Sequence, residues 1–343
     1  MNKATIITIV VSMLLCSCGG VDKPQTSSAH RGVYHWKTTY NPTEWEKQWM
    51  KDHKVDKLYI KLFDVEAGNK ASEPEWNMVP IATTSFKQKL PKEMDVIPVV
   101  YITVDAIRAL EANSWHWGNT ERYAKLIVKR IDDMMAEHYE GTIREVQLDC
   151  DWTQQTERTY FMLALEVKEL LHERGITLSG TLRLHQLHEV ENPIKNEIYL
   201  RGTDSIPFDR SLLMCYNTGR LQDIHTDNSI LDFDDVKPYL KQYHLETLPR
   251  TDVAYPVFGW AVEFYEDGRF SSLINSHNME YARAQKNIWG TDIREEWGEP
   301  REIRKTQRAL PILDSAHTTI LYHLDSLNLS KYSYEDIEEF YSR

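Results

Sequence analysis

The chain has 343 residues, of which 41% are hydrophobic and 11% aromatic, so it can bury a substantial core. Its formal net charge is −12 without a basic stripe, which argues against a nucleic-acid partner and against electrostatic attachment to anionic lipid. Beyond residue 18 only Cys150 and Cys215 remain, too few for a disulfide framework. Both lie in strand-like runs, which favours buried free thiols over a disulfide between them.

Residues 1–17 are typical of an export signal, with a short positive start and an apolar run. That run is shorter than the about 20 residues that a membrane-spanning helix requires. It ends in "LCSC", residues 15–18, which resembles the lipobox of bacterial lipoproteins. The resemblance implies acylation of Cys18 and attachment to a membrane of the bacterial cell envelope through the acyl chains; an ordinary secretory signal is the alternative. Residues 18–31 are small and polar and predict a flexible tether.

From residue 32 onward, strand-like and helix-like runs alternate. The strand-like runs are apolar and bounded by turn residues, and they cover 32–40, 57–65, 95–106, 145–153, 176–187, 210–219, 252–264 and 318–329. Helical patterns lie at 41–53, 120–139, 156–175, 232–244, 279–313 and 334–341.

This alternation predicts an α/β protein in which eight parallel strands close into a single (β/α)8 barrel over residues 32–343. The chain has no internal repeat, low-complexity block or mid-chain linker, which favours one domain over two. An open doubly wound parallel sheet is the alternative, because the helical patterns at 83–90 and 188–200 are weak.

The fourth strand-like run contains two aspartates, Asp149 and Asp151. Side chains alternate along a strand, so these two share one face and would point into a barrel, with Asp151 near the C-terminal end where barrel enzymes carry their active sites. Lys61, Arg183 and His185 face inward from other strands by the same argument. The aspartates either form a buried ion network with these basic groups or take part in function.

Two short stretches, "LDCDWT" at 148–153 and "LMCYN" at 213–217, resemble strands of the family 18 chitinases. That family has Asp-x-x-Asp-x-Asp-x-Glu on its fourth strand and Met-x-Tyr on its sixth. Asp149 and Asp151 match the last two aspartates, and Met214 and Tyr216 match Met-x-Tyr. The resemblance implies that Asp151 orients and stabilises the N-acetyl group of the substrate during substrate-assisted hydrolysis, and that Tyr216 helps to hold that group.

The match departs from the family at two positions: Val146 replaces the first aspartate, and Thr153 replaces the glutamate that donates the proton. A hydroxyl cannot replace that carboxyl group near neutral pH. Three functions stay open. The first is a glycoside hydrolase in which Asp151 is nucleophile or stabiliser and another strand supplies the acid. Candidates for that acid are Glu157, Glu263 and Asp325.

The second function is glycan binding without cleavage, and the third is metal-dependent hydrolysis or deacetylation. The metal alternative has the least support, because His185 and His188 are the only close histidine pair near the strand ends and the chain has no HExxH motif or cysteine cluster. No glycine-rich phosphate loop occurs, so we expect neither a nucleotide nor another cofactor.

Tryptophans support a carbohydrate ligand, because the C–H faces of sugar rings stack on aromatic rings. Several lie at strand ends or in loops: Trp36, Trp76, Trp115, Trp117, Trp152 and Trp260. Each could instead be a packing residue, and for Trp152, on the helix-facing side of its strand, packing is favoured. The rim pocket should bring together Asp151, Tyr216, Met214, Arg183, His185, Glu263 and some of these tryptophans.

Overall fold

The computed structural model describes residues 29–68, 78–112, 118–187, 206–242, 248, 250–289, 292–310 and 317–342. The predicted signal, the lipidation site Cys18, most of the tether, and Trp76, Trp115, Trp117 and His188 lie outside these residues. In the described part, every helix is too short or too polar to form a membrane span.

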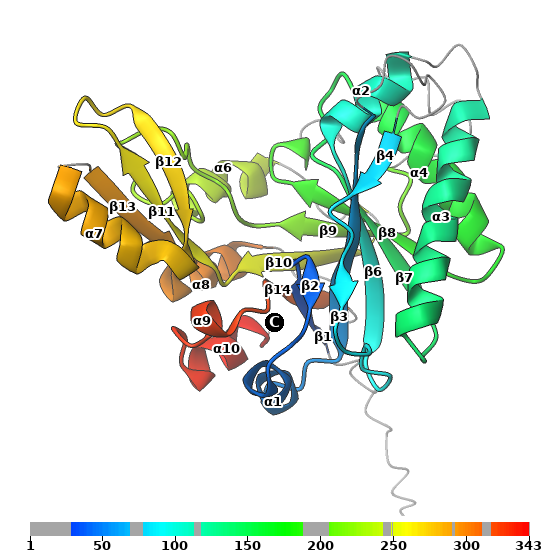
Figure 1. The fold of residues 1–343 in the computed structure, drawn as a ribbon, viewed down its shortest axis with the longest axis horizontal. Helices are drawn as coiled ribbons and strands as arrows, with labels where there is room; N and C mark the ends of the chain where they lie inside the picture. Colours follow the sequence, from blue (N-terminus) through cyan, green and yellow to red (C-terminus); the bar gives the residue numbers. More distant parts are fainter. Residues whose placement is uncertain are drawn as a thin grey trace, which may run out of the picture.

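Eight parallel strands form a closed barrel (Figure 1). They are β1 (His30–His35), β3 (Lys57–Ala67), β6 (Asp95–Ile102), β7 (Glu145–Asp149), β8 (Thr177–Arg183), β9 (Arg210–Met214), β10 (Thr251–Pro256) and β14 (Thr318–Tyr322). The sheet closes because β1 pairs with both β14 and β3. The predicted barrel is therefore confirmed, and the open sheet is excluded.

Helices surround the barrel: α1 (Glu44–Asp52), α2 (Val104–Ala112), α3 (Gly118–His138), α4 (Glu157–His172), α6 (Phe233–Gln242), α8 (Pro300–Ala309), α9 (Ser326–Leu329) and α10 (Tyr334–Phe340). Figure 1 shows α3 and α4 outside β6, β7 and β8. Helix α1 begins with a capping box, in which Thr43 and Glu46 bond each other's backbone N–H groups. Trp152 packs edge-on against Phe161 of α4 and is fully buried, as expected for a packing residue.

Several predicted strands end earlier than expected. The third ends at Ile102, and α2 begins at Val104. The first ends at His35; beyond it, β2 (Thr39–Tyr40) pairs with β5 (Ser85–Phe86), so the weak pattern at 83–90 is not a helix. A further strand, β4 (Met78–Ile81), runs antiparallel to β3.

The seventh strand-like run, 252–264, is two strands rather than the one predicted. Strand β10 ends at Pro256, and β11 (Gly259–Phe264) belongs to a separate antiparallel sheet with β12 (Phe270–Asn275) and β13 (Asp292–Trp297). The two connections between the barrel and this separate sheet pass so closely that a Cβ added to Gly298 would lie 2.0 Å from the carbonyl oxygen of Pro256. The 3-10 helix η4 (Ser276–Asn278) and α7 (Met279–Trp289) complete this insertion, which Figure 1 shows to one side of the barrel.

The barrel interior carries a buried ion network, but at the end opposite the strand C-termini. Arg210 Nη2 lies 2.6 Å from Asp252 Oδ1, and Lys57 Nζ lies 3.8 Å from Glu145 Oε2. Lys61, considered above as a partner for the aspartates, instead bonds Asp64 at 2.9 Å. Cys150 and Cys215 are free and buried, as predicted.

Candidate functional site

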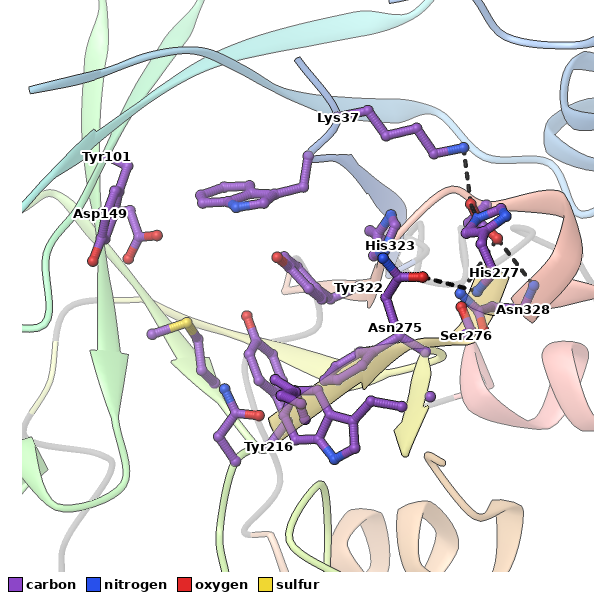
Figure 2. A pocket seen from close by; sticks show the side chains of 18 of the residues that line it. Lys37, Tyr101, Asp149, Tyr216, Asn275, Ser276, His277, Tyr322, His323 and Asn328 are labelled. Atoms are coloured by element: carbon purple, nitrogen blue, oxygen red, sulfur yellow. Dashed lines mark hydrogen bonds and ion pairs between the residues drawn. The ribbon is translucent and has the colours of Figure 1, made fainter. Parts of the chain in front are cut away.

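A cavity of about 770 Å³ opens where the barrel strands end and the insertion begins (Figure 2). Its walls combine residues at or just beyond the C-terminal ends of barrel strands with residues of β11, β12 and η4. The lining residues are Trp36, Lys37, Tyr101, Asp149, Asp151, Arg183, Met214, Tyr216, Asn217, Phe258, Gly259, Trp260, Leu273, Asn275, Ser276, His277, Tyr322, His323, Asp325 and Asn328. We refer to it as the aromatic cavity.

Six aromatic side chains form a continuous wall. Tyr216 stacks on Tyr322 with 5.2 Å between ring centroids, and Trp36 lies 5.6 Å from Tyr322. The ring centroid of Phe258 lies 5.5 Å from that of Tyr322 and 5.2 Å from that of Trp260. Tyr101 contacts Trp36 and completes the wall. Such a wall offers broad apolar faces, while hydroxyl and indole N–H groups remain at the ring edges.

The ring of Trp260 is held by a buried carboxylate. Its Nε1 donates to Glu296 Oε2 at 2.7 Å. The same oxygen accepts from the backbone N–H of Ser229 at 3.0 Å and from its hydroxyl, and Arg294 bonds the other oxygen of Glu296 at 2.5 Å. Because Glu296 ties two strands of the insertion to the loop after β9, it fixes the tryptophan relative to the barrel.

Asp151 is bonded on both carboxylate oxygens by Arg183. Arg183 Nε donates to Oδ1, and Nη2 donates to Oδ2 at 2.6 Å. Both side chains are partly exposed and line the aromatic cavity. A bidentate pair of this kind fixes the orientation of the carboxylate and offsets its charge.

Asp149 lies deeper and is held differently. Its Oδ1 accepts from the Thr181 hydroxyl at 2.5 Å, and Figure 2 shows it beside Tyr101. Burial, and after it the negative charge of Asp151, raise the pKa of Asp149 from 3.8 to about 7. This carboxyl is therefore partly protonated at neutral pH.

Asp325, the third carboxylate of the cavity, is strongly bound as an anion. Lys37 Nζ and His277 Nε2 each lie 2.9 Å from Oδ2, and the Asn328 backbone donates to Oδ1 at 3.1 Å. Burial alone would raise the pKa of Asp325, but the bonds from Lys37 and His277 outweigh burial and hold it well below its usual value. Asp325 therefore stays ionised and cannot serve as a proton donor.

The remaining predicted site residues lie outside the cavity lining. Glu263 accepts from the hydroxyls of Ser271 and Ser272 at 2.8 and 2.9 Å within the insertion. Glu157 is buried at the first turn of α4, and His185 is exposed beyond β8. Thr153 is exposed and takes part in the turn that leads into α4.

The structure thus brings together eight residues of the predicted set: Trp36, Asp149, Asp151, Arg183, Met214, Tyr216, Trp260 and Asp325. Sequence reasoning missed Tyr101, Phe258, Asn275 and His277. Tyr101 could have been found, since it lies on the third predicted strand near its C-terminal end. Among the described residues, no group of three or more His, Cys, Asp and Glu side chains is arranged to hold a metal ion.

No protein-family model and no curated protein sequence matches this chain. Solved structures do match it. The class V chitinase of Nicotiana tobaccum aligns with a TM-score of 0.57 and 10% identity, over 92% of this chain and 99% of that one. The GH18 chitinase ChiB of Flavobacterium johnsoniae aligns with a TM-score of 0.55 and 13% identity, over 92% of this chain and 94% of that one.

The spore cortex-lytic enzyme SleL of Bacillus cereus also matches, with a TM-score of 0.53 and 13% identity, over 92% of this chain and 74% of that one. At such low identities these matches establish a shared fold. They confirm the predicted likeness to the barrel of family 18 chitinases.

Proposed function

We propose that this protein binds a glycan in the aromatic cavity and does not cleave it. The observation that carries the proposal is the wall of six aromatic side chains, interrupted by polar groups such as Asn217 and Asn275. Ligand sites combine apolar surface with a few placed polar groups, and sugars require both, because each ring has apolar C–H faces and hydroxyl edges.

The carboxyl groups of the cavity support binding over cleavage. Glycoside hydrolysis requires one carboxyl group to protonate the leaving oxygen and usually a second carboxylate or a substrate group to act as nucleophile. Asp151 is occupied by Arg183, and Asp325 is held ionised by Lys37 and His277. Thr153, at the position of the chitinase acid, is a hydroxyl outside the cavity lining.

Structures of the same fold suggest the first ligands to test. They include chitinases, one of them solved with NAG4, and spore cortex-lytic enzymes. We therefore expect N-acetylglucosamine oligomers or peptidoglycan fragments to bind. Calorimetric titration should show saturable binding, and mass spectrometry of the mixture should show no new reducing ends.

Replacement of Trp36 by alanine should weaken binding about tenfold, because one stacking face is lost. Trp45→Ala is the matched control, since Trp45 is an exposed tryptophan on α1 away from the cavity. If Trp36→Ala and the control bind equally well, the ligand does not occupy the aromatic cavity.

Hydrolysis is the second candidate, and the raised pKa of Asp149 favours it. A carboxyl group with a pKa of about 7 that faces the cavity has the property that a general acid needs. New reducing ends that disappear in Asp149→Asn would establish this alternative. In that case Asp149 is the acid, and Asp151 the stabilising carboxylate.

We also propose that the protein is a lipoprotein of the bacterial cell envelope, on the basis of the "LCSC" motif. Incorporation of a labelled fatty acid in the native host should require Cys18. A Cys18→Ser variant that still incorporates the label would contradict this assignment.

A further inference from the structure

A second hollow of about 540 Å³ adjoins the aromatic cavity on the other side of η4. It lies between the insertion and the region of α9, and its main lining residues are His277, Arg283, Glu295, Trp297, Leu327 and Lys331. Figure 1 shows α7 and α9 flanking this part of the molecule. We call it the distal hollow.

The geometry of β13 explains why one strand serves both sites. Glu296 faces the barrel side of the insertion and bonds Trp260, whereas Glu295 and Trp297 face the opposite side, as alternation along a strand requires. Trp260 therefore lines the aromatic cavity, whereas Glu295 and Trp297 line the distal hollow, which Glu296 borders as well.

The aromatic cavity and the distal hollow adjoin each other. Ser276 and His277 line both of them. Gly259 lines the aromatic cavity, and a Cβ added to it would lie only 3.5 Å from Lys331 Nζ, which lines the distal hollow. The side chain of His277 is 58% exposed at this boundary, where Asp325 holds it.

The distal hollow also combines apolar side chains, among them one tryptophan, with charged groups. Trp297 is 43% exposed, with Lys331 Nζ 5.4 Å from its ring centroid, and Leu327 is 41% exposed. Arg283 binds Glu295 through two contacts of 2.6 Å, which places donors and acceptors beside the tryptophan. Large exposed apolar side chains gathered with polar groups in one hollow are typical of binding surfaces.

We propose that a glycan chain bound in the aromatic cavity continues over His277 into the distal hollow, where Trp297 stacks on a distal sugar ring. This inference rests on the proposed function and extends it: the ligand is an oligosaccharide chain rather than a single sugar or a disaccharide. Arg283, Glu295 and Lys331 would bond the hydroxyl groups of that distal sugar.

The test compares a short and a long N-acetylglucosamine oligomer by calorimetric titration of the full chain. Trp297→Ala should weaken binding of the long oligomer about tenfold and leave the affinity for the short one unchanged, because only the long one reaches the distal hollow. Leu327→Arg, a surface change on α9 that obstructs the hollow, should act in the same way. Trp260→Ala should weaken the binding of both oligomers, and Trp45→Ala should leave the binding of both unchanged.

Equal affinity of the long oligomer for the parent protein, Trp297→Ala and Leu327→Arg would overturn the distal site, while a loss in Trp260→Ala would leave the proposed function standing. If neither oligomer nor any peptidoglycan fragment binds the parent protein, the proposed function itself is wrong, and the distal site falls with it.

Discussion

Asp149, the last residue of β7, and Asp151, just beyond it, lie two residues apart but differ in environment. Asp151 forms a bidentate pair with Arg183 at the partly exposed rim, whereas Asp149 is buried and accepts a hydrogen bond from the Thr181 hydroxyl. A carboxylate without a cationic partner in a low-dielectric site favours its protonated form. The same cavity therefore holds one carboxylate that is paired with arginine and one carboxyl group that is partly protonated at neutral pH.

This difference gives the stability of the protein a pH dependence that Asp149→Asn should remove. Because the folded-state pKa is raised from 3.8 to about 7, the contribution of Asp149 to the free energy of unfolding is fully present below pH 3.8 and is lost as the pH rises through 7. As the pH rises between these limits, the free energy of unfolding of Asp149→Asn should therefore increase by about 4 kcal/mol relative to that of the parent.

Denaturant unfolding of the parent and of Asp149→Asn at acidic and mildly alkaline pH measures this difference. The contributions of the other titrating groups to the free energy of unfolding largely cancel in the comparison. A difference that does not change with pH would show that Asp149 titrates normally.

Glu296 offers a second test at the level of one side chain. Glu296→Ala removes the acceptor for Trp260 Nε1 and leaves the Ser229 hydroxyl and N–H without their partner. We expect a more mobile Trp260 ring and about tenfold weaker glycan binding, whereas Glu296→Gln, which keeps an acceptor oxygen, should lose less. Tryptophan fluorescence anisotropy and calorimetry report the two effects.

The matched control for Glu296 is Glu299→Gln, an exposed glutamate just before α8. Unchanged anisotropy and affinity in Glu296→Ala would show that packing alone positions the tryptophan.

At the scale of elements, the insertion depends on the close crossing of its two connections to the barrel. Gly298→Ala should destabilise the protein by about 1–3 kcal/mol and weaken binding, because the new Cβ would clash with the carbonyl of Pro256 and displace β13 and β11. In Gly141→Ala the nearest atoms are the ring end of Tyr139, which can move, so the loss should be smaller. Equal melting temperatures for the two variants would contradict this account.

The sequence was informative where a local pattern determines the structure. Alternation along β7 and β8 correctly directed Asp149, Asp151 and Arg183 into the cavity. The division of 252–264 escaped detection because β10 and β11 are both largely buried, so the apolar run continues across the break at Pro256. Asn275 and His277 join the site only through the insertion, and no local pattern reports such a long-range arrangement.

At the scale of the whole molecule, two basic side chains of the cavity, Arg183 and Lys37, are each paired with a carboxylate. Arg183 is matched by Asp151, and Lys37 by Asp325. Binding of an uncharged glycan should therefore change by no more than about twofold between low and high salt, because screening acts on unpaired charges. Calorimetry across a salt series tests this, and a steep loss of affinity with salt would indicate an anionic glycan instead.

The parallel barrel also places the start of β1 and the aromatic cavity at opposite ends. Strand β1 starts at His30 at one end of the barrel, and the aromatic cavity lies at the other end, where the eight parallel barrel strands terminate. A chain anchored at Cys18 has 12 residues to His30, at most about 40 Å when extended, and it enters the barrel on the side away from the cavity. Under the proposed anchoring at Cys18, strand polarity alone would place the mouth of the site on the far side of the barrel from the point of attachment.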